Sequence, residues 1–271
     1  MKRFFTLLLV VAMLGSTAYG WGRLGHATIA KIAEDHLTPK AKKLITKYLD
    51  GASIIEYASY PDDYRHVHLI DLGFEPSNSP RKVVWGHSYQ ANADGTLFHG
   101  ERKGNEYVKN CTGRIEGVIK DFAENHKTMS DSARVVSLAF IVHIVGDIHC
   151  PKHIRYTDEP TSGGYKVDFF GRKISYHAYW DGEALMRLHR WGFSDLAYLL
   201  DRYSKSEIAA IQQGDIYSWA EENAKESRFT LETKAGDSIT RSGLNRDVRF
   251  AEKQLRHAGY RLAGLLNKIL K

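Results

Sequence analysis

Two histidine–carboxylate pairs stand at a four-residue spacing in this sequence. His143 and Asp147 interrupt the apolar run 135–148, and His177 and Asp181 repeat the arrangement further along the chain. Residues four apart on a helix lie on one face, so each pair can point into a single site. A buried carboxylate is costly unless it is paired or bound to a metal ion. Each pair therefore indicates either a hydrogen bond inside the core or a metal site.

Further metal-ligating residue types lie between and before the two pairs. His149 and His153 flank a Cys-Pro-Lys segment, whose proline ends the preceding helix and can turn His153 back toward the site. Asp62 and His68 lie earlier, in the segment YPDDYRHVHLID. Imidazole and carboxylate groups together suit zinc, and more than four such ligands imply more than one ion. The combination predicts a multinuclear zinc centre.

These residues must be positioned by helices, which the spacing of apolar residues predicts along most of the chain. Thr38-Pro39 has the N-cap and first-turn chemistry of a helix start, and Ser130 or Asp131 can cap the apolar helix. The stretch 70–109 lacks helical spacing and is expected to form a long loop or a small hairpin around 92–95. The expected helices span 24–37, 39–51, 109–126, 131–149, 176–191, 205–213, 215–229 and 244–270.

The first twenty residues have the pattern of a secretory signal peptide. Lys2 and Arg3 precede the apolar run 4–14, and Ala18 and Gly20 are the small residues that a signal peptidase reads. The run is too short for a membrane anchor. Cleavage after Gly20 would leave 36 basic and 32 acidic residues, a net charge of +4 that permits an anionic substrate without requiring one. We expect an exported chain, periplasmic or extracellular.

The remaining 251 residues are expected to form one domain, 21–271. The chain is 43% hydrophobic with only 6 Pro, which excludes intrinsic disorder. The sequence therefore predicts an all-α, single-domain, multi-helix bundle-like fold with long loops around a buried metal cluster.

Six blocks of this chain resemble the tri-zinc class I nucleases, the nuclease S-one and P-one type, whose superfamily includes zinc-dependent phospholipase C. The blocks run from Trp21 to Asn267. They are WGRLGH, YPDDYR, HLID, HIVGDIHCPKH, YHAYWD and QLRHAGYRLAGLLN. The resemblance implies hydrolysis of single-stranded DNA or RNA to 5′-phosphorylated products, with 3′-nucleotidase activity. The nucleophile it implies is a hydroxide held between two zinc ions.

The resemblance also implies which residues hold three zinc ions. Each set is given by residue number in this chain. The first ion would be held by Asp62, His68, His143 and Asp147; the second by His153, His177 and Asp181; the third by His26, the shared Asp147 and the α-amino nitrogen and carbonyl oxygen of Trp21.

Substrate contacts follow from the same resemblance. Asp62 and Arg65 match the catalytic block, in which the arginine contacts the scissile phosphate. Asp71 matches a carboxylate that reads the edge of a nucleobase. Leu69 replaces the aromatic residue that stacks on the base, which weakens stacking. Cys150 also departs from the pattern, since the family has glutamine there.

Two other functions remain open at the level of sequence. A phospholipase C-type phosphodiesterase is the alternative, although that branch ends its second zinc site with glutamate and spaces the two histidines of that site more closely. The second alternative is a non-enzymatic protein in which zinc only stabilises the fold. Structural zinc sites are usually rich in cysteine, and the candidate ligands include no plausible cysteine, so this alternative is disfavoured. Neither a protein partner nor a membrane anchor is implied, and a monomer is expected.

The remaining histidines and cysteines have simpler interpretations. His66 and His68 are alternative metal ligands, and so are His149 and His153. The family pattern favours the later residue of each pair as the ligand. Cys111 and Cys150 are expected either as one disulfide, which export would permit, or as separate thiols. His87 and His99 belong to an aromatic-rich loop that either rims a nucleobase groove or simply packs. The four histidines expected on solvated helix faces are His36, His126, His189 and His257.

Overall fold

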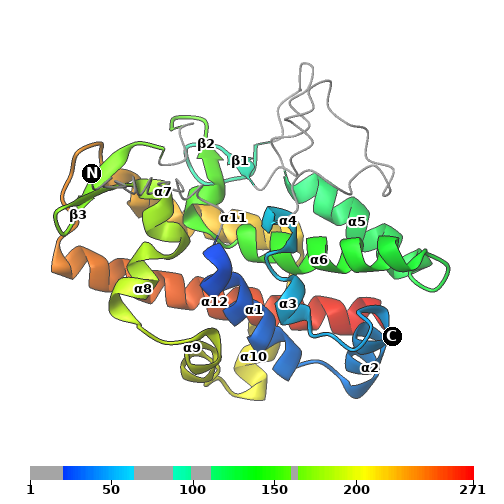
Figure 1. Ribbon diagram of the computed structural model, residues 1–271. Coiled ribbons are helices and arrows are strands. Elements are labelled where there is room, and N and C mark those ends of the chain that lie inside the picture. Colours follow the sequence, from blue (N-terminus) through cyan, green and yellow to red (C-terminus); the bar gives the residue numbers. More distant parts are fainter. Residues whose placement is uncertain (1–20, 64–87, 99–110, 160–163) are drawn as a thin grey trace, which may run out of the picture.

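The computed structural model describes residues 21–63, 88–98, 111–159 and 164–271. Most of these residues are helical (Figure 1). The α-helices are α1 Gly22–Asp35, α2 Pro39–Tyr48, α3 Ile54–Tyr57, α4 Tyr60–Asp63, α5 Cys111–Asn125, α6 Asp131–Asp147, α7 Tyr176–Ala178, α8 Ala184–Leu188, α9 Phe193–Leu200, α10 Lys205–Ile211, α11 Ile216–Glu226 and α12 Arg241–Ile269. The expected mainly helical fold is confirmed.

The described strands are short and form two pairs. β1 Tyr89–Ala91 lies parallel to β2 Ile154–Tyr156, and β3 Lys166–Phe169 is antiparallel to β4 Arg172–Ser175. The turn expected around 92–95 is present, because Gly95 donates its N–H to the Asn92 carbonyl at 2.9 Å. The β1–β2 pair joins the loop before α5 to the segment after α6.

The long helix α12 crosses the whole molecule, and α1 packs along it (Figure 1). The two helices approach closely at Gly259, where an added Cβ would lie 2.7 Å from the Cβ of Ile32. Gly259 is therefore required by packing. This contact brings the first described helix of the chain against the last.

Among the long helices that the structure describes, α6 has the largest buried share. The side chain of Ser130 caps it by accepting a hydrogen bond from the N–H of Ala133, and every residue from Ser137 to Asp147 is buried. It contacts α1, α2, α3, α4, α5 and α12. The near-absence of a polar face in 135–148 correctly predicted an interior helix.

The helix expected over 176–191 is broken in the structure. α7 passes into a π-helical turn, Tyr179–Glu183, before α8 begins, and the backbone at Gly182 is not helical. Such π turns are frequent at functional sites because they shift the direction of side chains within a helix. This turn carries Asp181.

Two expectations about individual residues need correction. His126 does not lie on a solvated face: it is only 3% exposed, and its Nδ1 lies 2.7 Å from the hydroxyl of Tyr48. Cys111 and Cys150 form no disulfide, since both are free, fully buried thiols. None of the described helices is both long enough and apolar enough to cross a membrane.

Candidate metal centre

The last turns of α6 bring His143 and Asp147 onto one buried face. Nε2 of His143 lies 3.1 Å from Oδ2 of Asp147, and neither side chain is exposed. The Nδ1–H of His143 donates a hydrogen bond of 2.8 Å to the carbonyl of Ala58. Because a carbonyl can only accept, this bond fixes the proton on Nδ1 and leaves Nε2 to face the carboxylates. A histidine oriented in this way is typical of a metal ligand.

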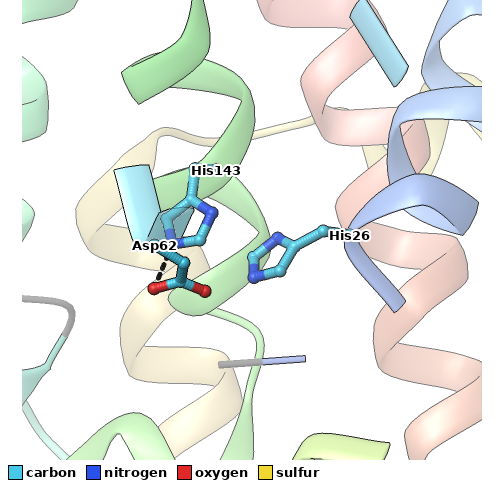
Figure 2. A group of neighbouring side chains, drawn as sticks. All are labelled: His26, Asp62 and His143. Carbon is cyan, nitrogen blue, oxygen red and sulfur yellow. Dashed lines mark ion pairs between the residues drawn. The ribbon is translucent and has the colours of Figure 1, made fainter. Parts of the chain in front are cut away.

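Asp62 reaches the same place from α4. Its Oδ1 lies 3.6 Å from Nε2 of His143, the contact drawn in Figure 2. Burial lowers the pKa of His143, but the charges of Asp147 and Asp62 outweigh it and raise the pKa to about 9. The carboxylates thus strongly favour a positive charge at this position, whether a proton or a metal ion supplies it.

His26 enters from α1 on the opposite side of His143. Figure 2 shows its ring beside that of His143, and the two rings stack with centroids 4.0 Å apart. Nε2 of His26 lies 3.3 Å from Oδ1 of Asp147. Gly146 makes room for this ring, because a Cβ there would be 3.0 Å from Nδ1 of His26.

Trp21 anchors the start of α1 at the same centre. Its side chain is fully buried, and its indole Nε1–H donates a hydrogen bond of 3.0 Å to the carbonyl of Gly146. The backbone then turns at Gly22, whose φ of +55° is in the left-handed region. A Cβ at Gly22 would lie 3.0 Å from the carbonyl oxygen of Asp181. The start of α1 therefore lies between the end of α6 and the π turn.

Asp147 occupies the middle of the arrangement. Its Oδ2 faces His143, while its Oδ1 faces His26 and also lies 3.7 Å from Nδ1 of His153. Burial raises the pKa of Asp147, but the charges of His143 and His153 outweigh it and hold the pKa well below its usual range. One carboxylate thus lies among three imidazoles from three segments, and its two oxygens point in different directions.

A second group of donors surrounds the π turn. Donor atoms of Cys150, His153 and Asp181 all lie within 4.8 Å of one another. Nε2 of His177 lies 3.5 Å from Oδ1 of Asp181, and the rings of His153 and His177 have centroids 5.2 Å apart. Burial, together with the charges of Asp147 and Asp62, raises the pKa of Asp181 well above its usual range. His177 and Asp181 do meet, as their spacing predicted.

His149 does not belong to either group. Its Nδ1–H donates to the carbonyl of Val145 at 2.7 Å, and its Nε2 accepts from Arg261 at 3.0 Å. Burial and the Arg261 charge lower the pKa of His149 well below its usual value, so it stays neutral. His149 thus links the end of α6 to α12, next to the segment that carries His153. Both of its ring nitrogens are occupied by hydrogen bonds, which agrees with the expectation that His153 and not His149 is the metal ligand.

The donor set fits a metal centre. Within the described part of the chain, neither ring nitrogen of His26 and neither carboxylate oxygen of Asp181 makes a hydrogen bond, although both side chains are buried. Buried polar atoms are rarely left in this state without a ligand. His26, Asp62 and His143 form one group with donor atoms within 4.8 Å, and Cys150, His153 and Asp181 form another. Nitrogen, oxygen and sulfur atoms of these kinds are the ligands of zinc in proteins.

Comparison with known proteins gives this geometry a context. A family model described as S1/P1 Nuclease matches residues 21–271. The chain belongs to the S1/P1 nuclease family. Endonuclease 4 of Arabidopsis thaliana is 24% identical over 302 residues, covering 99% of this chain and 95% of that protein. Nuclease P1 of Penicillium citrinum is 24% identical over 287 residues, covering 92% of this chain and 97% of that protein. Nuclease S1 of Aspergillus oryzae is 24% identical over 196 residues, covering 67% of this chain and 60% of that protein.

Membership of the S1/P1 nuclease family makes the chain a hydrolase of phosphodiester bonds in nucleic acid. Several residues with an expected role in that reaction lie outside the described residues. These are Arg65, His66, His68, Leu69, Asp71, His87 and His99. The described part of the centre thus contains the contributions of α1, α4, α6, the 3-10 turn 151–153, α7 and the π turn.

Sequence reasoning did not single out Cys150, although its Sγ lies within 4.8 Å of donor atoms of His153 and Asp181. Cys150 was treated as a departure from the family pattern and as a disulfide candidate, and a cysteine ligand was considered implausible. The local signal was limited to the two-residue gap between Cys150 and His153, which places both residues on one tight turn but does not reveal the approach of Asp181.

Proposed function

We propose that this chain is a zinc-dependent phosphodiesterase. It hydrolyses single-stranded DNA or RNA to 5′-phosphorylated products and also acts as a 3′-nucleotidase. The observation that carries the proposal is Asp147, a fully buried carboxylate among His26, His143 and His153. A carboxylate whose two oxygens face different histidines is suited to bridging two ions.

Three zinc ions are assigned to three sets of residues. Asp62, His68, His143 and Asp147 hold the first; His153, His177 and Asp181 hold the second; Trp21, His26 and Asp147 hold the third. Bound zinc would supply a nucleophile near neutral pH and a counter-charge for the phosphate. The buried donors keep this chemistry in a site of low dielectric, where electrostatic stabilisation is strong.

The chain's own residues bind and orient the substrate. Arg65 contacts the scissile phosphate and stabilises the charge that develops on it, three residues after the ligand Asp62. Asp71 accepts hydrogen bonds from the edge of a nucleobase. Leu69 offers an apolar surface without an aromatic face, so we expect base selection to depend more on Asp71 than on stacking.

Export and catalysis are linked through Trp21. We assign signal-peptide cleavage to the bond after Gly20, which gives Trp21 a free α-amine. That amine and the Trp21 carbonyl complete the third zinc set with His26. The assignment is supported by the buried indole, its hydrogen bond to the carbonyl of Gly146, and the approach of Gly22 to the backbone of Asp181.

Metal content and substrate selectivity test this function directly. Mature protein is analysed for zinc by elemental analysis, and its turnover is measured on single-stranded DNA, double-stranded DNA and phosphatidylcholine vesicles. We expect three zinc ions per chain, preference for the single strand, loss of activity in EDTA and recovery with zinc. Turnover of phosphatidylcholine but not of DNA would support a phospholipase C-type enzyme instead. EDTA-resistant cleavage would contradict zinc dependence.

A further inference from the structure

Cys150 lies at a distinctive point of the metal centre. It follows the end of α6 and is the N-cap of a 3-10 turn, Pro151–His153, so that residues 150 and 153 lie on the same side of one tight turn. The residue is fully buried. Its Sγ lies within 4.8 Å of a ring nitrogen of His153 and a carboxylate oxygen of Asp181. A sulfur atom is therefore close to two other metal donors.

Asp181 supplies independent evidence that this place binds a cation. The residue is 5% exposed, and neither of its carboxylate oxygens accepts a hydrogen bond within the described part of the chain. Nε2 of His177 lies 3.5 Å from its Oδ1. A buried carboxylate in these surroundings is unfavourable unless a positive ion compensates it. One carboxylate oxygen of Asp181 lies within 4.8 Å of the sulfur of Cys150.

We infer that Cys150 is a thiolate ligand of the metal ion that His153, His177 and Asp181 hold. This inference rests on the proposed zinc dependence and adds a donor to one of its sites. The metal–sulfur bond replaces the S–H bond, and the proton leaves to solvent. The resulting set has one sulfur, two imidazole nitrogens and one carboxylate oxygen.

The backbone of the turn fixes Cys150 and His153 relative to each other. The N–H of His153 donates a hydrogen bond of 3.1 Å to the carbonyl of Cys150. This bond closes the 3-10 turn Pro151–His153, so the sulfur of Cys150 and the imidazole of His153 are held at the same centre.

Cys111 is a buried cysteine that lies away from the candidate metal ligands, and it serves as a comparison for Cys150. It is equally buried, at the start of α5, but it belongs to neither group of candidate metal ligands found among the described residues. Its thiol fills core volume as a small apolar group would. Burial alone therefore does not distinguish the two cysteines, whereas proximity to Asp181 and His153 does.

The fourth protein donor changes the character of this site. Zinc with four protein ligands in tetrahedral geometry is typical of structural sites, whereas catalytic zinc keeps one position open for water. We therefore expect the ion at Cys150 to be held more tightly than one with three ligands. Its sulfur also favours thiophilic metals such as cadmium.

Cobalt substitution tests the ligand directly. Wild-type protein, Cys150→Ser and the matched buried control Cys111→Ser are stripped of metal and reloaded with cobalt(II). Metal content is measured in parallel with the near-ultraviolet sulfur-to-cobalt charge-transfer band. We expect full intensity in wild type and in Cys111→Ser, and complete loss of the band in Cys150→Ser.

The outcomes separate this inference from the proposed function. Failure of wild-type protein to bind metal would overturn both. Normal metal binding without a sulfur band, or a band lost only in Cys111→Ser, would overturn the Cys150 assignment alone. If Cys150→Ser does not fold, Cys111→Ser still decides the question, because any sulfur band in that variant must come from Cys150.

Discussion

Replacing Gly146 by alanine is expected to displace His26 and destabilise the metal centre. In α6 the glycine faces α1, and an added Cβ would lie 3.0 Å from Nδ1 of His26, 3.2 Å from its Cε1 and 3.2 Å from Cδ1 of Ile29. The imidazole is fully enclosed and stacks on His143, so it has little space to move away. The methyl group must therefore shift either the ring or the whole of α1.

Two opposing effects set the magnitude. Alanine is favoured over glycine within a helix by about 1 kcal/mol. Overpacking a closed site costs about 1–3 kcal/mol. The net result is a destabilisation of up to about 2 kcal/mol, which for a chain of this size lowers Tm by up to roughly 8 °C. Since the ring that moves is a proposed ligand of the third zinc, metal content should fall by one ion.

Gly117→Ala is the matched control. Gly117 lies on the exposed side of α5, and an added Cβ would have nothing within 4 Å, so only the gain in helix propensity remains. We expect a rise in Tm of roughly 2–4 °C and unchanged zinc. Thermal unfolding is measured with and without EDTA, and zinc by elemental analysis. If Gly146→Ala gained stability like Gly117→Ala and kept all its zinc, His26 would not lie against α6.

Four further changes test other parts of the centre. Asp147→Asn is expected to remove the two ions that this carboxylate bridges, and wild-type zinc content in elemental analysis would disprove the bridging role. Arg65→Ala should retain the metal but lower kcat/KM on single-stranded DNA by roughly 10²–10³-fold; unchanged kinetics would make Arg65 a surface arginine. A chain with one methionine before Trp21 should lose one zinc and most of its nuclease activity, because an amide nitrogen cannot replace the free amine; equal zinc and equal rate would leave a two-zinc site. His257, whose Nδ1 lies 3.5 Å from Oε1 of Glu222, and the guanidinium of Arg261, which donates a hydrogen bond to Oε2, lower the pKa of Glu222 from 4.5 to about 2. This carboxylate therefore stabilises the fold above about pH 4.5 and loses that effect as the pH falls toward 2. Glu222→Gln should flatten the acid side of the stability profile in that window, and an unchanged urea midpoint there would contradict the assignment.

The helical framework was predictable wherever one physical signal dominated. Thr38 and Ser130 cap α2 and α6 as their side chains indicate, and the continuous apolar surface of 135–148 correctly predicted an interior helix. The i, i+4 spacing also placed His143 with Asp147 and His177 with Asp181. Helix caps and helical periodicity are local properties, so a single sequence is enough to reveal them.

The features that were missed depend on contacts between distant segments. Apolar spacing continues through 176–191, but the helix is interrupted by a π turn at Tyr179–Glu183, where the backbone of Gly182 is not helical. His126 was expected on the surface because its helix is amphipathic, but its ring stacks on Phe122 and its Nδ1 lies 2.7 Å from the hydroxyl of Tyr48, which is far away in sequence. Cys150 was missed because its neighbour Asp181 is brought to it by the fold. Tertiary proximity of this kind cannot be read from spacing.

The pairing of α1 with α12 sets an order for assembly of the molecule. During synthesis, Trp21 and His26 emerge long before Arg241–Ile269, the 29 residues against which their helix packs. Closing a loop that contains nearly the whole chain is slow, because the chain loses conformational entropy before the contact between α1 and α12 contributes any stabilisation. We therefore expect the residues of the centre that are made first to reach their final packing only when α12 docks. Metal supplied to a refolding chain should reach its full count only after the C-terminal helix docks, so a ribosome-bound chain lacking that helix has no complete centre.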